Sequence, residues 1–363
     1  MTLVNKNSSI YVAGHKGLVG SAIVNALQGK GYNNLILRTH SELDLTDQQK
    51  VKSFFEKEKP EYVFLAAAKV GGIMANSLYR AQFIYENIQI QNNVIHNSWS
   101  SGVKKLLFLG SSCIYPRLAP QPLKEEYLLT DELEYTNEPY ALAKIAGIRM
   151  TESYNLQYGT NYLAVMPTNL YGLNDNFHLR RSHVLPAMIR KMHLAKCLEQ
   201  GNIDAIRTDL LRHPMEDIRH DAPEAALTAF LNSQGISGTG NTATLTLWGT
   251  GTPLREFLWS GDMADACVFV MENVDFSDLA KESAPEIRNT HINIGSGKEI
   301  TIRELAYLVK KIVGFDGKIA FDASKPDGTP RKLLDVSKLE KLGWKYTVEL
   351  DDGIRRVYDN YRR

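Results

Sequence analysis

Short apolar stretches alternate with amphipathic ones along the first half of the chain. We expect strands over residues 9–13, 35–38, 62–66, 105–109 and 162–166, and helices over 21–27, 48–57, 75–100 and 140–158. Strands this apolar are buried on both faces of a sheet. Their order therefore predicts an α/β fold with a doubly wound parallel sheet and right-handed crossovers.

The composition is that of an ordinary globular protein. Among 363 residues, 44% are hydrophobic and 23% are charged, and the net charge is only +1. These values exclude a disordered chain, a coiled coil and a fibre. With no basic field to hold nucleic acid or an anionic membrane, we expect neither as a partner.

The three cysteines are Cys113, Cys197 and Cys267. An odd number at such wide spacing argues against a disulfide framework, and the absence of a C-x-x-C pair argues against a metal site. The first residues lack an apolar run of signal-peptide length, and no stretch has the roughly 18 apolar residues of a membrane span. We therefore expect a cytoplasmic protein with free thiols.

The regular alternation of apolar and amphipathic stretches ends after Pro167. A helix is expected over 184–194, followed by a variable stretch over 195–243 that we interpret as a helical excursion ending in a surface loop, more an insertion than a core element. Order resumes with a strand over 244–248, a helix over 263–271, a strand over 291–294 and a helix over 301–313, the last with a Thr301/Glu304 capping box. The predicted division is a Rossmann-type domain over 1–172 and a smaller α/β lobe, mainly for substrate, over 173–363.

Gly14, Gly17 and Gly20 lie between the first strand and the first helix. The first glycine permits a tight turn, the second lets the backbone approach a pyrophosphate, and the third lets helix and strand pack closely. The N–H groups of Leu18 and Val19 would open the helix toward the phosphates. This position predicts dinucleotide binding.

The end of the second strand bears on the choice between NAD and NADP. No acid occupies the tip, where NAD sites place Asp or Glu, and Arg38 and His40 lie there instead. Lys16 adds a cation in the glycine loop, and Asp44 is expected at the adenine edge. The pattern favours NADP(H); the alternative is that Arg38 is only a solvated charge.

Ser111 follows the fourth strand, and Tyr140 and Lys144 lie four residues apart on one face of the expected helix. A nearby ammonium is expected to lower the pKa of the phenol from about 10. Ser111 would hold a substrate oxygen while Tyr140 transfers the proton that hydride chemistry on a carbonyl requires.

At this point the sequence resembles the extended short-chain dehydrogenase/reductase superfamily, and within it the GDP-L-fucose synthases. The similar blocks occur in order at residues 110–116, 137–144, 166–172, 175–178, 182–187, 248–257 and 323–335. The similarity extends from about residue 8 to the end of the chain and is interrupted mainly at 195–243.

The resemblance implies 3,5-epimerisation and NADPH-dependent 4-reduction of GDP-4-keto-6-deoxy-D-mannose. Ser111, Tyr140 and Lys144 would form the reductase set, and Cys113 and His183 the epimerase base and acid. A 4-keto group acidifies the neighbouring C–H bonds, so one base and one opposing acid can invert each centre through an enolate. Cys113 could instead be a small buried hydrophobe, and His178 competes with His183 for the acid role.

The resemblance also implies the binding residues. Those expected at the substrate are Ser112, Asn169, Lys191, Trp248, Arg255 and Lys325. Those expected at NADP(H) are Gly14, Lys16, Gly17, Leu18, Val19, Arg38, His40, Asp44, Ala67, Tyr140, Lys144, Pro167, Asn169, Leu170 and His183. The long helices over 75–100 and 140–158 are expected to form a homodimer.

Three alternatives stay open. A GDP-4-keto-heptose C4 reductase is the rival within the class, although a pure reductase would be expected to lose Cys113 or His183. A nucleotide-sugar 4-epimerase or 4,6-dehydratase uses the same Tyr/Lys pair, but a dehydratase typically carries Asp-Glu where this chain has Ser112-Cys113. A non-enzymatic NADP sensor would usually break the Tyr/Lys set, which is intact. Lys16 and His40 stand where members of the family often carry Arg; both can still carry a positive charge, so NADP(H) remains the expected cofactor.

Overall fold

The computed structural model describes residues 5–238, 242–280, 286–325 and 327–363. The chain divides into two compact units, each made of several segments. The first comprises residues 1–174, 256–298 and 332–348, and the second comprises 175–255, 299–331 and 349–363. None of the described helices is long and apolar enough to cross a membrane.

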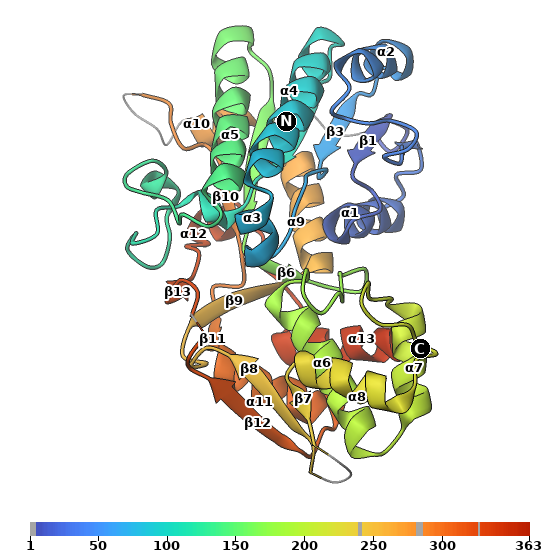
Figure 1. Cartoon of the computed structure of the whole chain (residues 1–363). Coiled ribbons are helices and arrows are strands. Elements are labelled where there is room, and N and C mark those ends of the chain that lie inside the picture. Colours follow the sequence, from blue (N-terminus) through green and yellow to red (C-terminus); the bar gives the residue numbers. More distant parts are fainter. Residues whose placement is uncertain (1–4, 239–241, 281–285, 326) are drawn as a thin grey trace. The chain divides into compact units, whose positions relative to one another are not determined.

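The first unit contains a six-stranded parallel sheet (Figure 1). Its strands, in spatial order, are β10 (Ile292–Ile294), β5 (Tyr162–Pro167), β4 (Lys105–Leu109), β3 (Tyr62–Leu65), β1 (Ile10–Ala13) and β2 (Leu35–Ile36). The predicted α/β fold with a doubly wound parallel sheet is confirmed. The strand expected near residue 292 is not part of the second lobe, because it pairs in parallel with β5 at the edge of this sheet.

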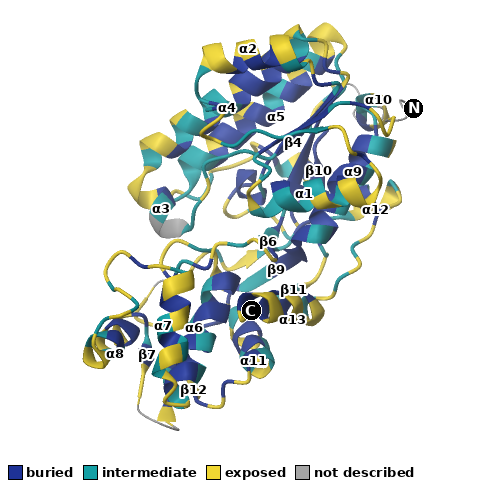
Figure 2. Cartoon of the chain, turned by 90° about the vertical axis from the view of Figure 1, so that its right-hand side faces the viewer, coloured by how far each residue is buried: buried dark blue, intermediate teal, exposed yellow. Residues whose placement is uncertain are grey.

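Helices cover both faces of the sheet. One face packs on α1 (Leu18–Gly29) and α9 (Ser260–Asn273), and the other on α2 (Gln48–Glu58), α4 (Arg80–Ser100) and α5 (Glu138–Tyr158). Successive residues of β1 alternate between the two cores: Ile10 and Val12 face α1, while Tyr11 and Ala13 face α2. Figure 2 shows the strands buried and the outer helix surfaces exposed.

The helix expected over 75–100 is interrupted. It divides at Tyr79 into α3 (Ile73–Leu78) and α4. The remaining elements of the first unit are η1 (Ser112–Ile114), η2 (Glu125–Tyr127), β6 (Asn169–Tyr171), α10 (Phe276–Ala280) and α12 (Ser337–Lys341). Strand β9 (Leu254–Trp259) begins at the end of a second-unit segment and pairs in parallel with β6.

The second unit contains both helices and strands. Its helices are α6 (Val184–Glu199), α7 (Ile203–Arg212), α8 (Glu224–Ser233), α11 (Ile302–Val313) and α13 (Leu350–Tyr361), and its strands include β7 (Ile236–Ser237), β8 (Thr244–Trp248), β11 (Glu299–Thr301) and β12 (Lys318–Asp322). Strand β13 (Arg331–Lys332) lies at a boundary between segments. The Thr301/Glu304 capping box opens α11 as expected.

The stretch over 195–243 is more than a surface insertion. It carries the end of α6, α7, α8 and β7, and Ile206, Leu210, Leu227, Leu231 and Ile236 bury their side chains in the second unit. The expected helical character of this stretch is confirmed, whereas the expectation that it contributes little to a core is wrong. Part of the expected terminal loop, residues 239–241, lies outside the described residues.

Candidate active site

A tight turn after β4 carries the first group of predicted site residues. Ser111 caps η1 with extended backbone, and its hydroxyl oxygen accepts the Cys113 N–H at 3.4 Å. The adjacent Ser112 and Cys113 are buried, with 4% and 8% of their surfaces exposed. In an open α/β sheet, ligands bind at the carboxyl ends of the strands, which is where this turn lies.

Helix α5 brings Tyr140 and Lys144 to the same turn. Pro139 lies in the first turn of the helix, where its missing N–H costs nothing. The Lys144 ammonium is buried and donates to the Leu109 carbonyl at 2.7 Å, and it lies 5.7 Å from the centre of the Tyr140 ring. The Ser111 hydroxyl is close enough to the Tyr140 phenol to lower its pKa, although burial outweighs this effect. Ser111, Cys113, Tyr140 and Lys144 thus form one group in the first unit.

Burial controls the ionisation of Tyr140 and Lys144. Desolvation raises the pKa of Tyr140, and Lys144 is not among the groups that shift it. The expectation of a lowered phenol pKa is therefore wrong for this arrangement, because the ammonium is directed at Leu109. Desolvation also lowers the pKa of Lys144 to about 8. A phenol with a raised pKa stays protonated near neutral pH, which suits a proton donor.

Opposing effects act on the pKa of the Cys113 thiol. Burial raises its pKa, while Lys332, the Ser111 hydroxyl and Lys144 each lower it. Sequence reasoning did not single out Lys332, although it belongs to the block at 323–335. Leu334, two residues later, packs in the same core as Ile114. No spacing rule links residues 113 and 332, so only the fold places this cation near the thiol.

The glycine loop fits the pyrophosphate of a dinucleotide. A Cβ at Gly20 would lie 2.1 Å from the Gly14 carbonyl oxygen, and one at Gly14, where φ is +84°, would lie 2.8 Å from the Ala67 Cα. Helix α1 has no side-chain cap at Gly17 and no acid in its first turn. Its first N–H groups, with those of Leu18 and Val19 among them, therefore offer an anion site.

Cationic side chains lie just after β2, and the carboxylates in the same region already accept hydrogen bonds from neighbouring threonines. The Glu42 carboxylate accepts the Thr39 N–H and hydroxyl, and the Asp44 carboxylate accepts those of Thr46. Lys16 and His40 are exposed, and His40 lies 3.9 Å from Asp44. Arg38 is half-buried. Its guanidinium donates to the Leu37 carbonyl at 2.8 Å and to Glu58 at 2.9 Å.

Two further predicted positions lie beyond β5. Pro167 ends that strand, and Asn169 and Leu170 begin β6. The Asn169 amide donates to the Glu256 carbonyl at 2.8 Å. Glu256, which the sequence analysis did not single out, is fully buried, and its carboxyl accepts the N–H groups of Gly297 and Leu334. These hydrogen bonds fix β9, the strand whose Glu256 carbonyl accepts the Asn169 amide.

In the second unit, three predicted substrate residues gather around two loops. The Lys325 ammonium lies 5.8 Å from the centre of the Trp248 ring, and Trp248 is 64% exposed. The negative charge of Asp327 acts on the Arg255 guanidinium. The Asp327 carboxylate also accepts the Thr250 N–H and hydroxyl. Asp327 is another residue that sequence reasoning missed. An exposed indole beside cations suits an aromatic base with phosphates.

Lys191 and His183 both lie on α6. Desolvation and the charge of Arg180 lower the pKa of Lys191, so its electrostatic neighbour is Arg180 rather than the Trp248 group. His183 is the exposed N-cap residue of the helix. His178, the alternative to His183 for the acid role, is held by hydrogen bonds within its own turn. Its Nδ1 accepts the N–H groups of Arg180 and Arg181, and its Nε2 lies 3.1 Å from Glu216.

The chain is similar to known proteins over nearly its whole length. The model of the NAD dependent epimerase/dehydratase family matches residues 10–210 and 218–295. The chain is 52% identical to GDP-L-fucose synthase 1 of Arabidopsis thaliana, covering 99% of this chain and 95% of that protein. It is 47% identical to GDP-L-fucose synthase of Escherichia coli, covering 96% and 95%.

A solved structure from Campylobacter jejuni is also similar. It is a GDP-D-glycero-L-gluco-heptose synthase in the presence of NADPH, 48% identical, with a TM-score of 0.90. The match covers 99% of this chain and 100% of that one.

Proposed function

The chain belongs to the NAD-dependent epimerase/dehydratase family, and on that premise we propose that it converts GDP-4-keto-6-deoxy-mannose to GDP-L-fucose by 3,5-epimerisation and NADPH-dependent 4-reduction. One observation carries the proposal. The Ser111 hydroxyl accepts the Cys113 N–H and acts on the pKa of the Tyr140 phenol, so a proton donor and a thiol flank the same serine. A base is required for epimerisation in addition to the proton donor required for reduction. The chain is thus an NADP-dependent oxidoreductase with epimerase activity.

NADP(H) is the cofactor. Bound NADPH supplies the hydride that reduces C4. The glycine loop and the uncapped start of α1 hold its phosphates, with Ala67 beside the loop. The Glu42 and Asp44 carboxylates already accept hydrogen bonds from Thr39 and Thr46, so cations rather than these acids face the ribose end of the cofactor. The NADPH of the similar Campylobacter jejuni structure supports this assignment.

Epimerisation requires a base and an acid on opposite faces of the sugar. In the proposed mechanism, the Cys113 thiolate removes the proton beside the keto group, and His183 delivers a proton to the opposite face. The negative charge that develops on O4 is stabilised by hydrogen bonds from Ser111 and Tyr140. The influence of Lys332 and Lys144 on the thiol supports this role, because both favour the thiolate.

Reduction follows at C4 of the epimerised sugar. Tyr140 donates its phenolic proton to O4 as the carbonyl becomes an alcohol, and the raised pKa of the phenol keeps that proton available. Ser111 holds the same oxygen, while Lys144 is fixed by the Leu109 carbonyl. Residues on β6, Asn169 among them, contact the ligands from the adjacent strand end.

The second unit binds the GDP portion. Trp248 offers a flat apolar surface to the base, and Arg255, Lys325 and Lys191 offer charge to the diphosphate. The gathering of Trp248, Lys325 and Arg255 supports this role. The division of labour that we propose is therefore cofactor and catalysis in the first unit and nucleotide-sugar binding mainly in the second.

A GDP-heptose reductase is the second candidate, and the likeness to a heptose synthase of Campylobacter jejuni is the observation that favours it. The two candidates are separated by comparing kcat/KM for GDP-4-keto-6-deoxy-mannose with kcat/KM for a GDP-4-keto-heptose. Our proposal expects the hexose to be the better substrate by about tenfold or more, the scale of losing or gaining one substituent in a pocket. Preference for the heptose would replace the first candidate by the second.

Arg38→Ala is expected to raise KM for NADPH about tenfold and to change KM for NADH little. The physical reason is that a guanidinium makes charge-assisted hydrogen bonds to a 2′-phosphate, which NADH lacks. Steady-state kinetics with each cofactor measures the effect. Glu58→Gln is the matched control, because it removes the charge paired with Arg38 and keeps the guanidinium. Equal losses with both cofactors would contradict the 2′-phosphate role.

We also propose a cytoplasmic homodimer formed through α4 and α5. These adjacent helices leave large apolar side chains exposed, and Tyr85, Leu142, Leu156 and Tyr158 are 63%, 42%, 55% and 44% exposed. Such a surface is typical of an interface. Light scattering at micromolar concentration is expected to give about twice the chain mass of 40.8 kDa. A mass of one chain would contradict the dimer.

A further inference from the structure

Arg190 is the largest fully buried side chain among the described residues, with no exposed surface. Its guanidinium pairs with Asp209 of α7 at 2.9 Å and donates to the His213 carbonyl at 2.6 Å. It also donates to the Phe177 carbonyl at 3.1 Å. A buried charge must be fully paired. Arg190 therefore fastens three pieces of chain together: α6, the stretch around α7, and the segment that precedes α6.

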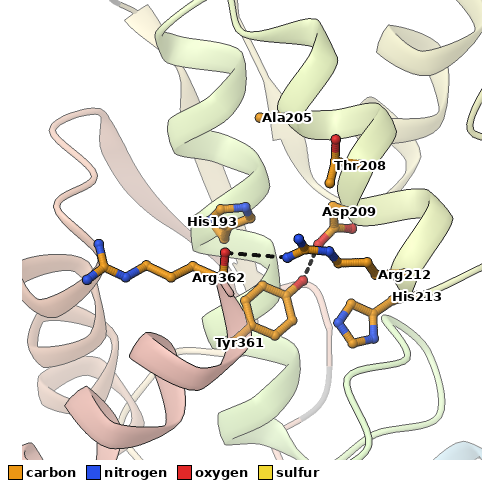
Figure 3. Close-up of a pocket in the computed structure, with 8 residues that line it drawn as sticks. All are labelled: His193, Ala205, Thr208, Asp209, Arg212, His213, Tyr361 and Arg362. Atoms are coloured by element: carbon orange, nitrogen blue, oxygen red, sulfur yellow. Dashed lines mark hydrogen bonds between the residues drawn. The ribbon is translucent and has the colours of Figure 1, made fainter.

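Aromatic packing fastens Phe177 a second time. Its ring lies 4.7 Å from that of Tyr361, and the His213 ring stacks on Tyr361 at 5.0 Å with an interplanar angle of 5°. The Tyr361 hydroxyl donates to Asp209, as Figure 3 shows beside a pocket of about 220 Å³. The backbone of Phe177 is thus held by Arg190 of α6, and its ring packs against Tyr361 of α13 and His213 at the end of α7.

Acidic residues just after α7 hold the next part of the same segment. Met215 and Ile218 form a β-bridge that places Glu216 and Asp217 at the tip of a turn. Glu216 pairs with Arg181 and lies 3.1 Å from the His178 Nε2. Asp217 pairs with Arg180 at 2.5 Å. The stretch 209–217, which we call the brace, therefore contacts the segment 177–181 along its length.

His183 follows that segment directly. The Ser182 N–H and hydroxyl both donate to the His178 carbonyl, at 3.1 and 2.6 Å. Because of these two hydrogen bonds, the position of His178 determines the positions of the residues that follow it in the turn. His183 is then the N-cap of α6, the helix that carries Arg190. We propose that the brace positions His183 for proton transfer. Its residues are positioning residues, because they act through His183.

The proposal rests on the proposed function, in which His183 is the acid of the epimerisation. It gives the region over 195–243 a task in that step. Proton transfer depends steeply on geometry, and a displacement of about 1 Å can cost about a hundredfold in rate. Exposed ion pairs contribute little to stability. Glu216, whose side chain is 62% exposed, can therefore be altered with little effect on the folding of the unit.

The test compares Glu216→Ala with Glu216→Gln, which keeps an acceptor for Arg181 and His178. Asp221→Ala is the matched control, since Asp221 is an exposed acid on the same region that pairs only with Arg219 among the described ion pairs. The measured quantity is solvent deuterium incorporation at C3 and C5 of the GDP-sugar at saturating substrate. We expect about a tenfold loss for Glu216→Ala, partial recovery for Glu216→Gln and no change for Asp221→Ala, with KM and melting temperature close to those of the unaltered protein.

Hydrogen exchange of the peptide covering residues 177–185, followed by mass spectrometry, gives a second readout that needs no activity. Exchange is expected to be faster in Glu216→Ala and unchanged in Asp221→Ala. Unaltered exchange and unaltered deuterium incorporation in Glu216→Ala would overturn the brace, as would a parallel loss of melting temperature and of C4 reduction. If His183→Asn itself epimerises at the normal rate, the acid assignment fails and the brace fails with it, and that variant identifies which of the two was wrong.

Discussion

Tyr140→Phe is expected to lower the rate of C4 reduction by about 10²–10⁴-fold, the usual contribution of a general acid. The ring is kept, so packing against Phe83, at 6.3 Å between ring centres, and cofactor binding should survive. NADPH oxidation measured at saturating substrate reports kcat, and fluorescence titration of NADPH reports binding. The effect should be on kcat, because the proton is transferred only in the reaction step.

Tyr154→Phe is the matched control for this variant. Tyr154 lies on the same helix, and its hydroxyl contacts the His96 Nδ1 at 2.8 Å rather than any residue of the catalytic group. Its turnover should be close to that of the unaltered protein. A Tyr140→Phe enzyme that turns over at a near-normal rate would show that the proton reaches O4 from another group.

Cys113→Ser is expected to abolish most epimerisation and to spare C4 reduction. A serine hydroxyl keeps the shape of the side chain but is far too weak an acid to form the required anion. Deuterium incorporation at C3 and C5 should fall by about 10²-fold or more, and the product should be the reduced sugar without inversion. Because burial raises the pKa of Cys113, only a small fraction is thiolate near neutral pH, and epimerisation by the unaltered protein should accelerate as the pH rises above neutrality.

Cys267→Ala is the control for Cys113→Ser, since Cys267 is another buried free thiol and lies within α9. It should leave the ratio of epimerised to unepimerised product unchanged. His183→Asn should resemble Cys113→Ser, because each removes one of the two proton-transfer groups. Normal stereochemistry and rate in Cys113→Ser would return Cys113 to a packing role.

Local signals were sufficient for much of the fold. The strand at 105–109 was predicted with its observed bounds, because four consecutive apolar residues after Lys105 end at Gly110 and leave little choice. The Thr301/Glu304 capping box was likewise readable from the sequence, since it depends on residues three apart. The helix at 75–100 was predicted too long, because nothing in its composition marks the break at Tyr79.

The parts that sequence could not give depend on contacts between distant residues. The ammonium of Lys144 was expected to act on Tyr140, yet tertiary structure supplies the Leu109 carbonyl as its partner and burial then controls the phenol. Lys332 reaches the environment of Cys113 only through the folded chain. The region over 195–243 was taken for an insertion because its polar surface is visible in sequence, whereas the buried Arg190–Asp209 pair is not.

We propose that the protein first inverts C3 and C5 and then reduces C4 of a GDP-4-keto-6-deoxy-hexose. This proposal is tested most directly by incubating the protein with GDP-4-keto-6-deoxy-D-mannose and NADPH in D₂O and examining the product by proton NMR and mass spectrometry. We expect NADPH oxidation and a fucose-configured product that carries deuterium at both C3 and C5. NADPH oxidation with no deuterium at either carbon would contradict the proposal, leaving a simple C4 reductase in which Cys113 and His183 have no catalytic task.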